Sequence, residues 1–161
     1  MCDKLYVGIA INSAKKPIFT VEHRERLLGK ITQEFGDKVE IVRVEGLLAD
    51  YAEENDIDFF VRGIRSFSDF DSEFTMGIIN RRLAQKETIF LQASSARVHI
   101  SSSLIRELSM YESRLSHFVP SAIEDEVYDH LFNHYRKQRL ANGQPASIKN
   151  GNGNGNGNGS S

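Results

Sequence analysis

Short apolar runs alternate with amphipathic stretches along most of the chain. The apolar runs predict four strands, at Leu5–Ile11, Lys38–Val44, Asp58–Val61 and Thr88–Gln92. The stretches after them have helical spacing and predict five helices: from a cap at Thr20 to Gly36, at Leu47–Glu54, at Ser68–Leu83, at about Ser102–Tyr111, and after the Ser121–Glu124 capping-box pattern. Alternating strands and helices predict an α/β fold with an open, doubly wound parallel sheet and helices on both faces.

Composition narrows the class of protein. The chain has 161 residues, of which 40% are hydrophobic and 26% charged, so it can bury a sizeable core. A formal net charge of -2 argues against a protein that coats nucleic acid. The single Cys2 excludes an internal disulfide and a site of several thiolates. No apolar run approaches the roughly 20 residues that span a bilayer, so we expect no membrane segment and a cytoplasmic location.

The composition changes near the carboxyl end. From Ala141 onward Asn, Gly, Gln, Ser and Lys dominate, and residues 150–159 alternate Asn and Gly. Such a segment buries too little apolar surface to offset its chain entropy. We therefore predict one domain over residues 1–139 and a disordered tail over residues 140–161.

Charged side chains cluster where the third predicted strand ends. Arg62, Gly63, Ile64 and Arg65 follow that strand, with Asp69 and Glu73 in the next helix. Ligands gather at the carboxyl ends of strands in open parallel sheets, and guanidinium groups bind phosphate oxygens through paired donors. The segment therefore indicates a polyphosphate site. The alternative is an ion-paired surface turn.

Two further segments at strand ends carry groups that bind anions. Lys15 follows the first strand and could reach a phosphate; the alternative, which the segment taken alone favours, is that Lys15 and Lys16 are solvated. Ser101, Ser102 and Ser103 open a helix after the fourth strand, where hydroxyls and unpaired amides attract anions. One serine is needed only as a cap. We expect Lys15, Arg62, Arg65 and the serines to converge in one cationic pocket.

The combined motifs resemble phosphopantetheine adenylyltransferase over about residues 3–135. The resemblance rests on the segments Ser13–Thr20 and Val61–Arg65, on Asp69, Phe70, Glu73, Asn80 and Arg81, and on Ile100–Ser103. It implies a Rossmann-like nucleotidyltransferase that transfers AMP from ATP to 4'-phosphopantetheine, giving dephospho-coenzyme A and pyrophosphate. It also implies Mg²⁺ held mainly by ATP phosphates, and a homo-oligomer, in this family a hexamer.

The resemblance assigns roles to individual positions. It implies that Lys15, Leu48, Arg62 and Asn80 bind phosphopantetheine, and that Lys15 and Arg65 are the catalytic cations. The implied ATP-binding residues are Gly63, Ile64, Arg65, Glu73, Arg97, Ile100, Ser101, Ser102 and Ser103. Arg97 departs from the family, which often has an aromatic residue there.

The largest departure is a missing segment. Family members begin with a further strand and a Gly-His loop, and no Gly-His dipeptide occurs here. Without this central strand, two inner strands would keep unpaired backbone groups. We expect an N-terminally truncated chain that starts at an internal methionine and has impaired turnover. The alternatives are a catalytically silent nucleotide or coenzyme A binding module, and an assembly subunit whose strand comes from another chain.

Overall fold

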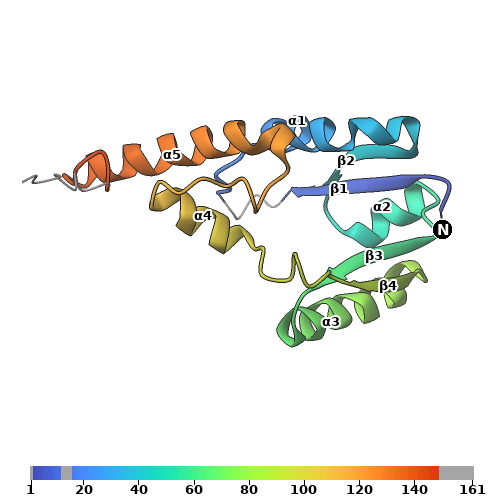
Figure 1. Cartoon of the computed structure of the whole chain (residues 1–161). Helices are drawn as coiled ribbons and strands as arrows, with labels where there is room; N and C mark the ends of the chain where they lie inside the picture. Colours follow the sequence, from blue (N-terminus) through green and yellow to red (C-terminus); the bar gives the residue numbers. More distant parts are fainter. Residues whose placement is uncertain (1, 12–15, 149–161) are drawn as a thin grey trace, which may run out of the picture. The chain divides into compact units, whose positions relative to one another are not determined.

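The computed structural model describes residues 2–11 and 16–148, and their elements follow the predicted order (Figure 1). The elements are β1 (Leu5–Ile11), α1 (Val21–Thr32), the 3₁₀ helix η1 (Gln33–Lys38), β2 (Val39–Glu45), α2 (Leu48–Glu54), β3 (Phe59–Ile64), α3 (Phe67–Ala84), β4 (Glu87–Gln92), α4 (Ser102–Met110), the 3₁₀ helix η2 (Ser121–Ile123) and α5 (Glu124–Ala141). They belong to two compact units, Met1–Ser101 and Ser102–Ser161. In the described ranges no helix has the length and apolar character required to cross a membrane.

Side-chain caps fix the start of two helices in the first unit. The Thr20 hydroxyl accepts a hydrogen bond from the His23 N–H at the start of α1, and the Ser66 hydroxyl accepts one from the Asp69 N–H at the start of α3. Such caps satisfy amides that have no partner within the helix. The predicted cap at Thr20 is confirmed, and α3 begins at Phe67, one residue before the predicted start at Ser68.

The predicted capping box before the last helix is wrong. Ser121 lies in η2, and α5 begins only at Glu124, with Ile123 as an N-cap that makes no side-chain cap bond. The 3₁₀ turn that follows Pro120 takes up residues 121–123. The helical backbone therefore starts too late for the Ser121 hydroxyl to cap it.

The four strands form two separate parallel pairs. Leu5–Ile11 of β1 lie opposite Val39–Glu45 of β2, and Phe59–Ile64 of β3 lie opposite Glu87–Gln92 of β4. Among the described residues, β1 and β3 therefore each have a partner on one side only. The α/β class with parallel strands is confirmed, and the described strands form two pairs in place of one continuous sheet.

Helices cover both strand pairs of the first unit. α1 packs on β1 and β2, α2 packs on β2, and α3 packs on β3 and β4. The side chains buried most completely between these layers include Ile9, Val44, Ala52 and Phe60. Each strand pair thus contributes its own buried side chains to the core of the first unit.

Gly77 allows α3 to approach β4 closely. A Cβ atom at this position would lie 3.3 Å from Phe90 Cζ and from Thr88 Oγ1. Replacing Gly77 with valine should lower the free energy of unfolding by about 1–3 kcal/mol in chemical denaturation, because overpacking displaces neighbouring side chains. Gly29 of α1 is the matched control, since its nearest contact would be at 4.0 Å. Equal losses for Gly29→Val and Gly77→Val would contradict this account.

Several large apolar side chains of α3 remain exposed. The Phe70 and Phe74 rings stack with centroids 5.5 Å apart, and Phe70 also packs edge-on against Phe90 at 5.8 Å. The helical spacing of Phe70 and Phe74 predicts that both pack in the core, yet their exposed fractions are 41% and 47%. Phe67 is 93% exposed. The homo-oligomer stays a prediction that a single chain does not test.

The second unit is built around a buried ion pair. Glu112 accepts hydrogen bonds from Arg139 Nη2 at 3.2 Å, from the Ser147 hydroxyl at 2.8 Å and from the Ile148 N–H at 2.9 Å. The helix α5 also continues to Ala141, beyond the predicted start of the tail at residue 140. Ser147 and Ile148 of the predicted tail are thus held by Glu112, and residues 149–161 lie outside the described part.

Candidate functional site

The first group of candidate residues lies in β3 rather than after it. The predicted third strand ended at Val61, but β3 continues to Ile64 because Arg62, Gly63 and Ile64 pair with Phe90, Leu91 and Gln92 of β4. Only Arg65 of the motif follows the strand. A Cβ atom at Gly63 would meet no atom within 4 Å, so the space beside this backbone is open to a ligand.

Arg62 forms a two-point ion pair with Glu73 of α3. Its Nη2 donates to Glu73 Oε1 at 2.7 Å, and its Nε donates to Oε2. This hydrogen bonding raises the pKa of Arg62 above its ordinary value, so the cation is permanent. The pair uses two of the five guanidinium donors, and the N–H groups of Nη1 lie outside it. Arg62 can therefore bind an anion while Glu73 holds it in place.

Arg65 joins the end of β3 to a loop that follows β4. Its Nε donates to Asp69 Oδ2 at 2.9 Å, and its Nη1 donates to the Ile100 carbonyl oxygen at 2.7 Å. Asp69 also accepts the backbone N–H of Arg65 at 3.3 Å. These contacts fix both the guanidinium group and the segment next to Ser101. The Arg65–Asp69 ion pair is what the alternative of a surface turn predicts. The same ion pair also holds the guanidinium group in one orientation, which a phosphate site requires.

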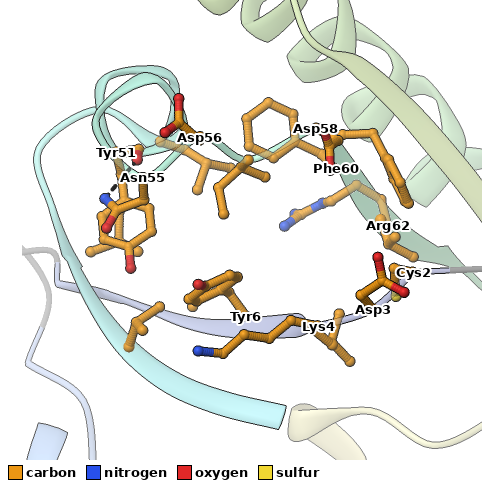
Figure 2. A pocket seen from close by; sticks show the side chains of 18 residues that line it. Cys2, Asp3, Lys4, Tyr6, Tyr51, Asn55, Asp56, Asp58, Phe60 and Arg62 are labelled. Atoms are coloured by element: carbon orange, nitrogen blue, oxygen red, sulfur yellow. Dashed lines mark hydrogen bonds between the residues drawn. The ribbon is translucent and has the colours of Figure 1, made fainter. Parts of the chain in front are cut away.

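A cleft of about 460 Å³ separates the two strand pairs of the first unit. Leu48 of α2 and Arg62 of β3 both line it, so two predicted phosphopantetheine-binding residues share one cavity. Tyr6 and Tyr51 also face it, and the Arg62 guanidinium projects into it (Figure 2). Burial raises the pKa of Tyr51. The cleft thus combines aromatic side chains with the Arg62 cation, and Lys4 and the carboxylates of Asp3, Asp56 and Asp58 also line it.

The remaining predicted ATP- and phosphopantetheine-binding residues of the first unit differ in their contacts and in their exposure. Glu73 is paired with Arg62, and Ile100 is held through its carbonyl oxygen by Arg65. Arg97 is exposed in a turn, where its N–H donates to the Ser94 carbonyl oxygen. Asn80 is buried on α3 with an exposed fraction of 6%. Its predicted contact with the pantetheine arm stays a prediction, because a ligand reaches it only if neighbouring side chains move.

The serine motif is divided between the two units. Ser101 ends the first unit, and Ser102 and Ser103 begin α4 in the second. Arg106, which sequence reasoning missed, donates through Nε to the Ser102 carbonyl oxygen and through Nη2 to the Ser103 hydroxyl. Its three- and four-residue spacing from the serines on a helix is the signal that could have found it.

The predicted convergence of all the cations stays a prediction. Lys15 lies outside the described residues, and Ser102 and Ser103 belong to the second unit. Arg62, Arg65 and Ile100 are held in one unit by the contacts given above. In the described part of the chain, no group of three or more histidine, cysteine, aspartate or glutamate residues is placed to hold a metal ion.

Comparison with known proteins decides the family. Residues 1–108 match the family model described as cytidylyltransferase-like. The chain is 36% identical to the phosphopantetheine adenylyltransferase of Caldanaerobacter subterraneus subsp. tengcongensis over 128 residues, which cover 79% of this chain and 79% of that protein. It is 34% identical to that of Streptomyces coelicolor over 131 residues, which cover 81% and 82% of the two chains. The chain belongs to the phosphopantetheine adenylyltransferase family.

Family membership explains why two fixed guanidinium groups lie at the end of β3. A phosphopantetheine adenylyltransferase is a nucleotidyltransferase, so fixed guanidinium groups are suited to its anionic ligands. The match to the protein from Natranaerobius thermophilus, at 36% identity over 128 residues, covers a similar share of both chains, 79% and 78%. The assignment therefore concerns most of the chain rather than one shared motif.

The Arg65–Asp69 contact should make stability depend on pH in the acid range. Hydrogen bonding from Arg65 lowers the pKa of Asp69 below its ordinary value of 3.8. The contribution is therefore fully present above pH 3.8 and is lost as the pH falls through the lower folded-state pKa. We expect Asp69→Asn to flatten this part of the pH profile of unfolding in urea. Asp71, which carries no such contact among the described hydrogen bonds, provides the control variant Asp71→Asn; an equal flattening by that variant would contradict the assignment.

Proposed function

We propose that this chain transfers AMP from ATP to 4'-phosphopantetheine, giving dephospho-coenzyme A and pyrophosphate, in coenzyme A biosynthesis. The supporting observation is that Arg62 and Arg65 are oriented by α3 carboxylates at the carboxyl end of β3 in a member of this family. Leu48, which lines the same cleft as Arg62, supplies an apolar surface for the pantetheine arm.

The reaction requires positioning more than covalent help from the protein. An oxygen of the pantetheine phosphate attacks the α-phosphorus of ATP and forms the new P–O bond. The bond from that phosphorus to the oxygen bridging to the β-phosphorus breaks, and pyrophosphate leaves with the electron pair. Negative charge is spread over phosphate oxygens throughout, so fixed cations lower the barrier by orientation and electrostatic stabilisation.

The proposed roles of Arg62 and Arg65 follow from the contacts of their side chains, and that of Lys15 rests on the family resemblance alone. Arg62 and Lys15 hold the acceptor phosphate, while Arg65 acts on ATP and positions the segment before Ser101. After its contacts with Asp69 and Ile100, Arg65 retains one N–H on each terminal nitrogen for ATP. The further ATP contacts are proposed for Gly63, Ile64, Glu73, Arg97, Ile100, Ser101, Ser102 and Ser103.

Magnesium fits this site only through the nucleotide. The described residues offer no cluster of three metal-ligating side chains, so the ATP phosphates would supply most of its ligands. When bound there, Mg²⁺ would neutralise charge on the leaving pyrophosphate. Arg62 and Arg65 act on the same phosphates from the protein side.

A second candidate function is favoured by the split sheet. A site at the carboxyl ends of strands needs neighbouring strands at a fixed spacing, and β1 and β3 are not paired with each other. The chain would then be a catalytically silent nucleotide or coenzyme A binding module, or an assembly subunit. A pyrophosphate-release assay with ATP, 4'-phosphopantetheine and Mg²⁺ separates these candidates. Turnover supports the transferase, whereas calorimetric binding of both substrates without pyrophosphate supports the binding module.

A further inference from the structure

The chain changes direction after α5. Gly143 has a φ of 70°, in the left-handed region that glycine adopts without strain. Its N–H donates to the Leu140 carbonyl oxygen at 3.1 Å, and the Gln144 N–H donates to the Arg139 carbonyl oxygen at 2.9 Å. These two bonds close the last turn of the helix and direct the chain away from its axis. Residues 143–148, which we call the strap, therefore leave α5 in a fixed direction.

The strap binds the buried ion pair of Glu112 and Arg139 through three consecutive residues. The Ala146 carbonyl oxygen accepts a hydrogen bond from Arg139 Nη2 at 2.9 Å. The Ser147 hydroxyl donates to Glu112 Oε2 at 2.8 Å, and the Ile148 N–H donates to Oε1 at 2.9 Å. Buried charged groups are stable only when their donors and acceptors are satisfied. The strap therefore completes the hydrogen bonding of both the cation and the carboxylate.

The same ion pair holds the end of α4. Arg139 Nη1 donates to the carbonyl oxygen of Met110, the last residue of α4, at 3.0 Å. Carbonyl groups in the last turn have no partner within the helix, and the helix dipole favours a cation beside them. Glu112 follows with a φ of 58°, which is uncommon for a residue with a Cβ atom and persists where several contacts hold it. The strap supplies two of those contacts and so helps to fix the backbone where α4 ends.

The opposite end of α4 carries two of the serines proposed to bind ATP. The helix has nine residues, Ser102–Met110, and is therefore about 14 Å long. Near its start, Arg106 donates to the Ser102 carbonyl oxygen and to the Ser103 hydroxyl. A short hydrogen-bonded helix transmits a displacement of one end to the other, since rigid elements carry coupling between separate positions. A change where α4 ends should therefore move the serines where it begins.

We propose that Glu112 and the strap position the nucleotide-binding end of α4, so that Ser102 and Ser103 are held in the arrangement that binds ATP. The inference rests on the proposed function, in which these serines contact ATP. Glu112 and the strap are positioning elements, because they act through α4 and not on the nucleotide itself. A strap bound to Glu112 favours ATP binding, and a strap that has left Glu112 disfavours it.

A negative charge at position 147 should release the strap. In Ser147→Asp a second carboxylate would face that of Glu112, and like charges in a buried site repel each other. Amide hydrogen exchange of the full chain without ligand measures the release. We expect exchange of the Ile148 amide, and of the Ser113 amide just after α4, to become about tenfold faster, the change that loss of one hydrogen bond to a charged group produces.

Three further variants separate the strap contact from other effects. Ser147→Thr keeps the hydroxyl group and should behave as the unaltered chain does. Ile148→Pro removes the second donor to Glu112 without adding a charge, and it should also speed exchange of the Ser113 amide. Ser116→Asp is the matched control, because Ser116 is an exposed serine of the same unit whose side chain makes no hydrogen bond among the described residues. It should leave exchange of the Ser113 amide unchanged.

Isothermal titration calorimetry with ATP and Mg²⁺ tests the positioning. We expect Ser147→Asp and Ile148→Pro to weaken ATP binding about fivefold or more, as coupling between two separate sites typically does. Binding of 4'-phosphopantetheine should stay within about twofold, because Leu48 and Arg62 belong to the first unit and distant sites are nearly independent. Ser147→Thr and Ser116→Asp should retain the ATP affinity of the unaltered chain.

The possible failures can be told apart. Equal loss of affinity for ATP and for 4'-phosphopantetheine would show general destabilisation and overturn the inference. Faster exchange of the Ser113 amide with unchanged ATP affinity would show that the strap holds α4 without positioning the serines, which overturns the inference and leaves the proposed function standing. Unchanged exchange in both Ser147→Asp and Ile148→Pro would also overturn it. An unaltered chain that binds no ATP would overturn the proposed function and the inference together.

Discussion

Replacing Arg62 with alanine is expected to weaken binding of 4'-phosphopantetheine roughly 10- to 150-fold, which corresponds to the ~1.5–3 kcal/mol of a hydrogen bond between charged groups. Arg62 lines the cleft and is held by Glu73, so its cation is oriented before a phosphate arrives. Isothermal titration calorimetry with the phosphorylated ligand measures the loss. Pantetheine without its phosphate should bind equally to both proteins, because the lost contact is to the phosphate.

A second arginine provides the matched control. Arg43 makes the same two-point contact with Glu25, at 2.6 Å from both Nε and Nη2, and does not line the cleft. Arg43→Ala should therefore leave the dissociation constant within about twofold, since it removes a comparable surface pair of small energetic value. Equal weakening by the two substitutions would show that Arg62 acts through stability and not through the phosphate.

Replacing Arg139 with alanine is expected to destabilise the second unit by about 3–5 kcal/mol, because it leaves the buried Glu112 carboxylate without its cation. The exposed side-chain fractions are 11% for Arg139 and 7% for Glu112. Arg139 also donates to the carbonyl oxygens of Met110 and Ala146, so the stretch around residues 110–112 and the segment at Ala146 lose a common partner. Native-state hydrogen exchange of the α5 amides measures the change.

The same unit contains an exposed pair for comparison. Arg114 contacts Asp125 at 3.1 Å, with exposed side-chain fractions of 68% and 89%. Arg114→Ala should cost no more than about 1 kcal/mol, because water screens and solvates both partners. A loss for Arg139→Ala as small as that for Arg114→Ala would contradict the assignment of Glu112 and Arg139 as the centre of this unit.

The local elements of the fold could be predicted because their signals are local. Thr20 is a helix cap by residue type and position, and the hydroxyl does accept the His23 N–H. The apolar run Leu5–Ile11 is a strand with the same limits in the sequence and in the structure. Where a predicted boundary was wrong, the observed boundary is set by pairing or packing between segments distant in the sequence. β3 extends over Arg62 and Ile64 because β4 pairs with it, which no local pattern near Val61 reports.

The candidate site was predictable in its residue types and only partly in its geometry. The arginines at the end of β3 were found from their spacing, and the structure adds that Glu73 and Asp69 orient them. Arg106 was missed, since its contact with Ser103 depends on where both side chains point along α4. The contacts of Glu112 with Arg139 and Ser147 join positions up to 35 residues apart. At that separation the sequence pattern does not indicate which residues pair.

By itself, the sequence determined the succession of strands and helices, the family, and the residue types available to bind phosphate, because each of these depends on neighbouring residues or on short motifs. The tertiary structure alone decided which carboxylate holds each arginine and that Leu48 and Arg62 share a cleft. It also showed that β1 and β3 leave their facing edges unpaired among the described residues. The physical reason is that strand pairing and ion pairing join residues far apart in the chain, and the free energy of those contacts is set by distance and burial in the folded molecule.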